Sequence, residues 1–207
     1  MKIIVANGPP RSGKDTVIAM LKEKLILDGR PVFELSYKWV LCKAVGERYG
    51  LSALAVWELN ADTDSKDEPS DLFDGKSVRQ ALIYESEDVI KVKYGPIGVA
   101  KLAFFDLQTE HGPLPRNAVV LNPDGGFEEE LGAFRAAFNV EPEDAFVLRM
   151  DRKGITFKGD SRGYISNPNL QVQNDGTLEE LEALVLPTLQ SFIDTPEAPY
   201  VMEGIPN

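Results

Sequence analysis

The sequence contains one cysteine, Cys42, one histidine, His111, and no long run of apolar residues. A single thiol excludes an internal disulfide. One cysteine and one histidine are too few for a zinc site built from these residue types, so we expect no structural metal. The apolar stretches, such as residues 118–121, are far too short to cross a membrane, and the first residues lack the long apolar region of a cleavable signal. We therefore expect a cytoplasmic protein.

The chain also lacks an excess of positive charge. It has 22 lysines and arginines against 33 acidic residues, which makes its net charge −11. Such a field repels polyanions and argues against binding to nucleic acid, so an anionic small molecule must be held by a focused basic patch. The hydrophobic fraction of 43% and the charged fraction of 27% are typical of a soluble globular protein. The length of 207 residues fits one domain, with or without a small lid.

Expected strands and helices alternate along the chain. The apolar patterns predict strands at residues 2–6, 31–35, 118–121, 145–150 and 170–173, and helices at 15–27, 37–49, 77–95, 98–109, 127–138 and 178–193. This alternation predicts an α/β fold in which helices cover a parallel sheet. Residues 60–76 are polar and rich in turn formers, which indicates an exposed loop, and residues 194–207 form a tail on the surface or a loose end.

The segment GPPRSGK, residues 8–14, fits the phosphate-loop (P-loop) pattern G-x-x-x-x-G-K, with a strand before it and a helix after it. Glycine lets the backbone turn so that its N–H groups point inward, and the start of the helix adds partial positive charge. Lys14 would then reach the β- and γ-phosphates of a nucleotide. The ATP-binding residues expected from the loop and the start of its helix are Gly8, Arg11, Ser12, Gly13, Lys14, Asp15 and Thr16.

The residue after the lysine departs from the usual pattern. Asp15 stands where a serine or threonine commonly supplies a hydroxyl ligand to Mg²⁺, and the hydroxyl comes one residue later, at Thr16. A carboxylate is also a hard oxygen ligand, so both residues are candidate Mg²⁺ ligands. The alternative for Asp15 is an acidic residue that simply favours the start of a helix.

The motif GPPRSGKDT resembles the phosphate loop of phage deoxynucleoside monophosphate kinases and related phage kinase-like proteins, which share the aspartate after the lysine. Four further patches, at residues 77–95, 122–130, 149–165 and 172–184, resemble the same group in the same order. The resemblance spans most of residues 3–193, although 51–58 and 108–117 match nothing in it. RSGKD is also similar to the loop of animal-type phosphomevalonate kinases.

This resemblance implies a three-layer P-loop fold with a parallel sheet flanked by helices. It implies one kinase domain at residues 1–193, with a substrate-binding helical region at about 37–112 and a lid at about 150–166. The implied activity transfers a phosphoryl group from ATP, with Mg²⁺, to a nucleoside or deoxynucleoside monophosphate. A phage protein of this kind would act in the host cytoplasm. The resemblance does not imply which acceptor is used.

Phosphoryl transfer needs positive charge around the moving group, and this draws attention to arginines. Arg149, Arg152 and Arg162 lie close together in a segment with several glycines that could close over the site, so at least one is expected to be catalytic together with Lys14. The alternative is a basic hairpin that balances an acidic surface.

The acceptor side is expected to use Lys66, Arg79 and Asp124. Arg79 begins the helix after the polar loop and could grip a phosphate in bidentate fashion. Asp124 follows the strand 118–121 at the carboxyl end of the sheet, where it would hold Mg²⁺ or orient the acceptor. Asn174 is expected beside the adenine of ATP.

Two other interpretations stay open. One keeps a P-loop kinase but gives it another acceptor, either a hydroxymethylated base in phage DNA or a non-nucleotide phosphate. The other is a nucleotide-binding regulator without catalysis, which the substitution at Asp15 allows. The expected partners are small nucleotides, with no membrane contact. The oligomeric state is open, with a homodimer as one option.

Overall fold

A computed structural model describes residues 1–62, 64–158 and 162–196. Residue 63, residues 159–161 of the expected lid and residues 197–207 of the expected tail lie outside this part. The chain divides into two compact units. The sheet unit comprises Met1–Glu34, Pro115–Phe127 and Arg135–Asn207, and the helical unit comprises Leu35–Leu114 and Glu128–Phe134.

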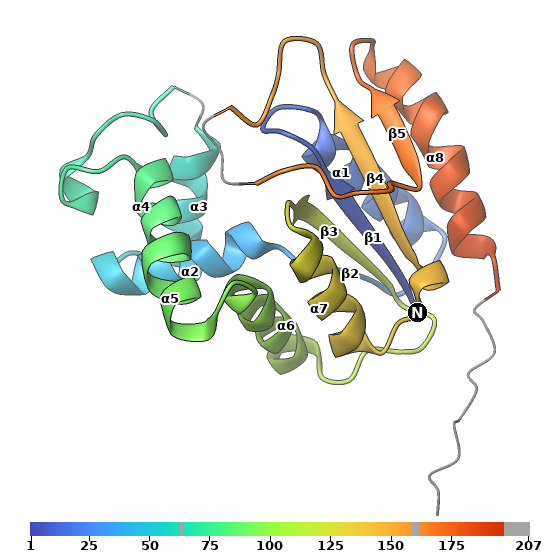
Figure 1. Ribbon diagram of the computed structural model, residues 1–207, viewed down its shortest axis with the longest axis horizontal. Coiled ribbons are helices and arrows are strands. Elements are labelled where there is room, and N and C mark those ends of the chain that lie inside the picture. Colours follow the sequence, from blue (N-terminus) through green and yellow to red (C-terminus); the bar gives the residue numbers. More distant parts are fainter. Residues whose placement is uncertain (63, 159–161, 197–207) are drawn as a thin grey trace, which may run out of the picture. The chain divides into compact units, whose positions relative to one another are not determined.

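The sheet unit contains five parallel strands in the order β2-β3-β1-β4-β5 (Figure 1). The strands are β1 (Lys2–Asn7), β2 (Val32–Glu34), β3 (Val119–Gly125), β4 (Ala145–Asp151) and β5 (Leu170–Gln173). The prediction of an α/β fold with a parallel sheet flanked by helices is confirmed. Strand β3 runs past the expected end at residue 121, because Asn122 continues the ladder opposite Val5 and Gly125 pairs with Asn7.

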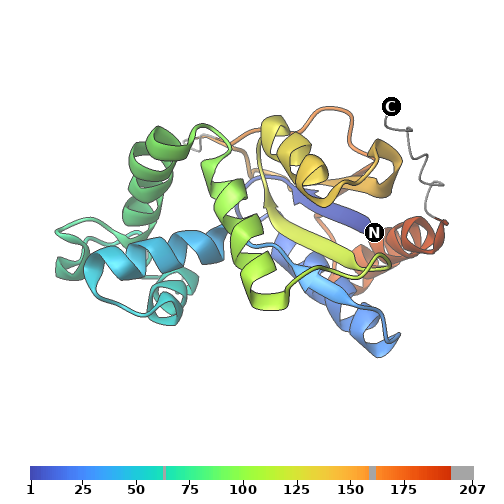
Figure 2. The ribbon, with the colours of Figure 1, turned by 90° about the horizontal axis from the view of Figure 1, so that it is seen from below.

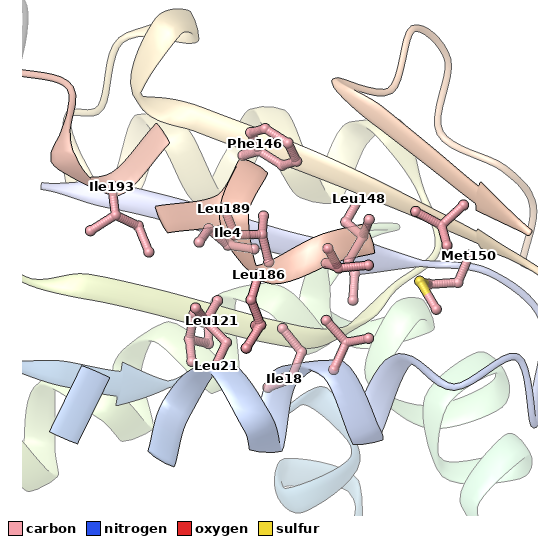
Figure 3. Close-up of a cluster of buried hydrophobic side chains, with 14 of the residues drawn as sticks. Ile4, Ile18, Leu21, Leu121, Phe146, Leu148, Met150, Leu186, Leu189 and Ile193 are labelled. Carbon is pink, nitrogen blue, oxygen red and sulfur yellow. The ribbon is translucent and has the colours of Figure 1, made fainter. Parts of the chain in front are cut away.

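Helices α1 (Lys14–Leu27) and α8 (Leu178–Asp194) pack together on one face of the sheet (Figure 2, blue and red helices). Their buried side chains form one core with the inward side chains of the strands (Figure 3). Ile18 and Leu21 of α1 and Leu186 and Leu189 of α8 lie in this core. Burial of a side chain of this size contributes about 1.5–3 kcal/mol, so this core holds β1 and α1 firmly on either side of their connecting loop.

The helical unit contains α2 (Tyr37–Tyr49), α3 (Ala53–Ala61), η1 (Asp71–Phe73), α4 (Val78–Tyr84), η2 (Glu85–Ile90), α5 (Lys91–Tyr94) and α6 (Gly98–His111). Its own core includes Cys42, Val45, Val56, Phe73 and Leu82. Helix α7 (Glu128–Phe138) begins in this unit, and η3 (Pro142–Asp144) precedes β4.

The helix expected at 77–95 is divided into three parts. Ser77 caps α4 through a capping box with Gln80, in which each side chain bonds the other residue's backbone N–H. The π-helical turn η2 then interrupts the α-helical hydrogen bonds before α5. It places Glu85 in the interior, where its carboxylate bonds Arg48. In the part of the chain that the structure describes, no helix is long and apolar enough to cross a membrane.

The strand order predicts a ligand position at the carboxyl ends of the strands. The strands β1 and β4 are neighbours in the sheet, but the chain leaves β1 towards β2 at one end of the strand order and leaves β4 towards β5 at the other end. Ligands of open α/β sheets bind beyond the carboxyl ends of the strands at such a switch point. The loops that follow β1 and β4 are therefore the first place to look for a site.

Candidate phosphate-binding site

The loop at residues 8–13 connects β1 directly to α1. Gly13 has φ 100° and Arg11 has φ 67°, so the backbone turns sharply at both residues. The Ser12 amide donates to the Pro9 carbonyl at 3.2 Å, which closes the turn. A side chain at Gly8 would put its Cβ 2.3 Å from the carbonyl oxygen of Met150, so only glycine lets the loop pass this close to β4.

Lys14 is folded back onto this loop. Its Nζ donates a hydrogen bond of 2.8 Å to the carbonyl oxygen of Pro9, and the residue is only 7% exposed. The ammonium group is therefore held against the loop backbone, at the first turn of α1. A cation placed there attracts an anion, and the start of the helix adds to the attraction.

Ser12 has a buried hydroxyl with no hydrogen-bond partner among the described residues. The residue is fully buried, and the hydroxyl lies near Gly8, because a Cβ at Gly8 would be 2.8 Å from Ser12 Oγ. Buried hydroxyls normally have partners. The Ser12 hydroxyl could therefore donate a hydrogen bond to an oxygen of a phosphate bound in the loop.

Two residues from other segments support the loop main chain. Asn174, just after β5, donates from Nδ2 to the carbonyl of Ser12 at 2.9 Å, while its backbone N–H bonds the carbonyl of Asp151 at 2.7 Å. Arg152 donates from Nη1 to the carbonyl of Arg11 at 3.2 Å. The structure thus brings the expected Asn174 and Arg152 to the loop. Their described contacts hold its backbone.

Arg149 has a different environment. It bonds the carboxylate of Asp151 at 3.1 Å, and its guanidinium lies 3.6 Å from the centre of the Tyr164 ring. Burial alone would raise the pKa of Asp151, but hydrogen bonds from Tyr164, Arg149 and Gln171 outweigh it and hold that pKa below its ordinary value. Burial and the bond to Asp151 raise the pKa of the Tyr164 phenol. These contacts join Arg149 to a compact cluster beside β4.

The stem of Arg162 lies over Gly126, just beyond the end of β3. A Cβ built on Gly126 would be 2.6 Å from both Cγ and Cδ of Arg162. The backbone N–H of Gly163 bonds the carbonyl of Gly126 at 3.1 Å, which fixes the arginine's main chain at the same place. The expected arginines therefore have distinct surroundings.

The expected oxygen ligands lie on two elements of the sheet unit. Asp15 and Thr16 are exposed in the first turn of α1, and Asp124 is 7% exposed at the carboxyl end of β3. No group of three or more His, Cys, Asp or Glu side chains is placed to hold a metal within the described residues. Mg²⁺ in phosphate sites commonly takes one or two carboxylates together with substrate oxygens and water, which this donor set fits.

Lys66 and Arg79, the residues expected on the acceptor side, both belong to the helical unit. The Arg79 N–H bonds the carbonyl of Lys66 at 3.3 Å, so the polar loop is attached to the start of α4. The Arg79 guanidinium pairs with Asp67, with a distance of 2.6 Å from Nε to Oδ1. The structure thus brings these two residues together, with Asp67 beside the arginine.

Sequence reasoning did not single out Asn7 or Asn122. Asn7 is fully buried and bonded on both sides of its amide, and Asn122 has a buried Nδ2 without a partner in the described residues. A signal was present, because both asparagines end apolar runs that read as buried strands. A polar side chain at a buried strand end needs a partner.

No protein-family model matches the chain, and no curated protein matches its sequence. Solved structures match at low similarity. An APS kinase (CysC) from Mycobacterium tuberculosis, in complex with AMPPNP and APS, has a TM-score of 0.46 at 13% identity and covers 91% of this chain and 97% of its own. A mutant of that enzyme gives 0.44 at 14%, covering 91% and 96%. Shikimate kinase from Aquifex aeolicus gives 0.39 at 17%, covering 91% and 96%.

At these TM-scores and identities, the substrates and site residues of the matched kinases do not carry over to this chain. Membership in the phage deoxynucleoside monophosphate kinase family likewise stays a prediction.

Proposed function

We propose that the protein is an ATP- and Mg²⁺-dependent phosphotransferase that converts a nucleoside or deoxynucleoside monophosphate into the diphosphate. The observation that carries this proposal is Lys14 held against the main chain of a strand–loop–helix turn, 2.8 Å from the Pro9 carbonyl. A buried ammonium, a sharply turned loop and a helix start are features that favour the binding of a polyphosphate, and they support the proposal. The sequence resemblance to phage kinases supports the nucleotide acceptor.

The proposed reaction moves the γ-phosphoryl group of ATP. The bond between the γ-phosphorus and its bridging oxygen breaks, ADP leaves with the electron pair, and an oxygen of the acceptor phosphate forms the new bond. A monophosphate dianion attacks without losing a proton, so the charges balance and no general base is needed. The protein's task is to position both phosphates and to supply positive charge.

Each proposed residue has one part of this task. Lys14, the loop amides and the Ser12 hydroxyl bind the β- and γ-phosphates. Bound Mg²⁺ would neutralise charge on those phosphates, with Asp15, Thr16 and Asp124 as the residues that would hold it. Asn174 and Arg152 keep the loop in shape through the Ser12 and Arg11 carbonyls. In the helical unit, Lys66 and Arg79 are the proposed acceptor-binding cations.

An assay of ADP formation tests the proposal. The purified protein is incubated with ATP, Mg²⁺ and each common nucleoside and deoxynucleoside monophosphate, and Lys14→Ala is compared with wild type. Removing one donor to the developing charge typically lowers kcat by about 100- to 1000-fold. Lys22→Ala is the matched control, because Lys22 lies on the same helix and pairs with Glu34 at the surface.

The expected result is turnover with at least one monophosphate, loss of turnover in Lys14→Ala and little change in Lys22→Ala. A protein that binds ATP but turns over none of the acceptors would show that the proposal is wrong. Equal turnover in wild type and Lys14→Ala would do the same, because it would place the reaction elsewhere or in a contaminant.

A further inference from the structure

Asn7 joins two distant segments at the point where the phosphate loop begins. It is the last residue of β1 and is fully buried. Its Nδ2 donates to the carbonyls of Gly125 and Gly163, both at 3.0 Å, and its Oδ1 accepts from the Ile165 N–H at 2.9 Å. All three bonds go to main chain, so the amide acts as a bracket between the end of β3 and residues 163–165.

This bracket fixes the arginine that precedes residue 163. The Gly163 N–H adds a bond to the Gly126 carbonyl, and the Arg162 stem lies on Gly126, where no side chain could fit beneath it. Asn7 pairs with Gly125 in adjacent strands, which lie about 4.8 Å apart. The stem of Arg162 therefore lies beside the strand that leads directly into the phosphate loop.

The surroundings of the other two arginines suggest different roles. Arg149 is held by Asp151 and covered by Tyr164. Arg152 bonds the loop carbonyl of Arg11, so it supports the backbone. The segment that follows Arg162 is held by the buried side chain of Asn7, at the end of β1 and directly before the loop.

We propose that Asn7 is a positioning residue that holds Arg162 at the phosphate loop, and that Arg162 supplies the positive charge to the phosphoryl group in transfer. This inference rests on the proposed function and names which of the three arginines acts. A neutral amide suits the task, because it can bond two carbonyls and one N–H at once without adding negative charge beside bound phosphates. Pre-positioned charge is effective in catalysis because it needs no reorganisation during the reaction.

Two independent variants displace Arg162, one through the bracket and one through Gly126. Asn7→Ala removes all three side-chain bonds. Gly126→Ala keeps those bonds but puts a methyl group where the Arg162 stem now lies, so it displaces the same arginine from the other side. A misplacement of about 1 Å can lower a rate about 100-fold. We therefore expect either variant to lower kcat about 10- to 100-fold, with the dissociation constant for ATP changed less than about twofold.

The decisive measurement is a double-mutant cycle with Arg162→Ala. If Asn7 and Gly126 act through Arg162, Asn7→Ala and Gly126→Ala change kcat less than about twofold in the Arg162→Ala background. Asn169→Ala is the matched control, because its side-chain oxygen bonds the Val147 N–H at 2.7 Å at the far end of the same segment. That variant should lower thermal stability and leave kcat unchanged.

The inference would be overturned if Asn7→Ala lowered kcat by the same factor in the wild-type and in the Arg162→Ala background, because the two residues would then act independently. It would also be overturned if Asn7→Ala lowered ATP affinity as much as kcat. Gly126→Ala keeps the test decisive if Asn7→Ala does not fold. Failure of the proposed function is recognised separately. If the proposed function is wrong, wild type and Lys14→Ala show the same ADP formation. If only the present inference is wrong, wild type forms ADP and Lys14→Ala does not, but the double-mutant cycle shows no coupling to Arg162.

Discussion

The side-chain amide of Asn174 donates a hydrogen bond of 2.9 Å to the carbonyl oxygen of Ser12. Because Gly13 comes next, the same amide nitrogen occupies the space where a side chain at Gly13 would start. A Cβ there would lie 2.3 Å from Asn174 Nδ2. The loop thus has its present shape because residue 13 has no side chain and residue 174 has an amide.

Gly13→Ala should therefore reduce ATP affinity about tenfold or more, which corresponds to about 1.4 kcal/mol. The new methyl group pushes Asn174 off the loop, and φ 100° strains any residue with a Cβ. Titration calorimetry with a non-hydrolysable ATP analogue measures the loss. Gly29→Ala is the control, because Gly29 has φ 70° with nothing within 4 Å of its Cβ position. It should cost about 1 kcal/mol of stability and leave ATP affinity unchanged.

The lowered pKa of Asp151 predicts how its contribution to stability depends on pH. The folded protein holds this carboxylate ionised to lower pH than the unfolded chain, whose pKa is about 3.9. Its stabilisation is therefore fully present above about pH 4 and is lost as pH falls through the folded-state pKa. Asp151→Asn should lower the unfolding temperature at pH 7, and its difference from wild type should shrink towards pH 2. Thermal unfolding followed by circular dichroism measures this gap, and a gap that stays constant to pH 2 would contradict the assignment.

Local signals in the sequence account for most of the fold. Apolar runs of strand length, and periodic apolar residues that stop at glycine, predict the elements around the loop close to their observed ends; the last strand, Leu170–Gln173, agrees at both ends. Helix α3 (Ala53–Ala61) was not predicted, although Ser52 caps it by accepting from the Ala55 N–H. Its apolar residues do not lie on one face, and Leu54 is exposed. The π-helical turn at Glu85–Ile90 was also missed, because no local pattern distinguishes it from an α-helix.

The candidate site divides in the same way. The phosphate loop could be predicted because its residues are contiguous, and their role as ligands of a nucleotide stays a prediction. The bracket of Asn7 could not be predicted from the sequence, because its partner Gly163 is 156 residues away in the chain. For the same reason, Arg149, Arg152 and Arg162 look alike in the sequence. Only contacts with distant elements, Tyr164, the Arg11 carbonyl and Gly126, tell them apart.

A buried ion pair between Lys2 and Asp144 joins the start of β1 to η3. The side chains are 6% and 9% exposed, and the Lys2 Nζ also lies 4.9 Å from the centre of the Phe192 ring. Removal of one partner leaves a buried charge uncompensated, so Asp144→Ala should cost about 3–5 kcal/mol in urea unfolding. The double variant Lys2→Met/Asp144→Leu should recover much of this loss. Lys24→Ala, which breaks an exposed i,i+4 pair with Asp28, should change stability by at most about 0.5 kcal/mol. A large loss there, or none in Asp144→Ala, would contradict this account.

Glycine-to-alanine substitutions in two helices should change stability in opposite directions. In an open helix position, alanine is favoured over glycine by about 0.8–1.0 kcal/mol. Gly132 in α7 is such a position, since nothing lies within 4 Å of its Cβ site, and Gly132→Ala should therefore stabilise the protein. Gly46 in α2 is not, because its Cβ would lie 2.7 Å from the carbonyl oxygen of Leu51, where the chain turns from α2 into α3.

The close contact at Gly46 involves backbone atoms, which cannot rotate away as a flexible side chain can. The Leu51 N–H also bonds the Gly46 carbonyl at 2.8 Å, so the turn cannot move without losing that bond. Overpacking of this kind costs about 1–3 kcal/mol, which exceeds the gain in helix propensity. Gly46→Ala should therefore lower the midpoint of urea unfolding while Gly132→Ala raises it. A rise in both midpoints would mean that α2 and α3 separate easily at this turn, because only a relaxed turn could accept the methyl group.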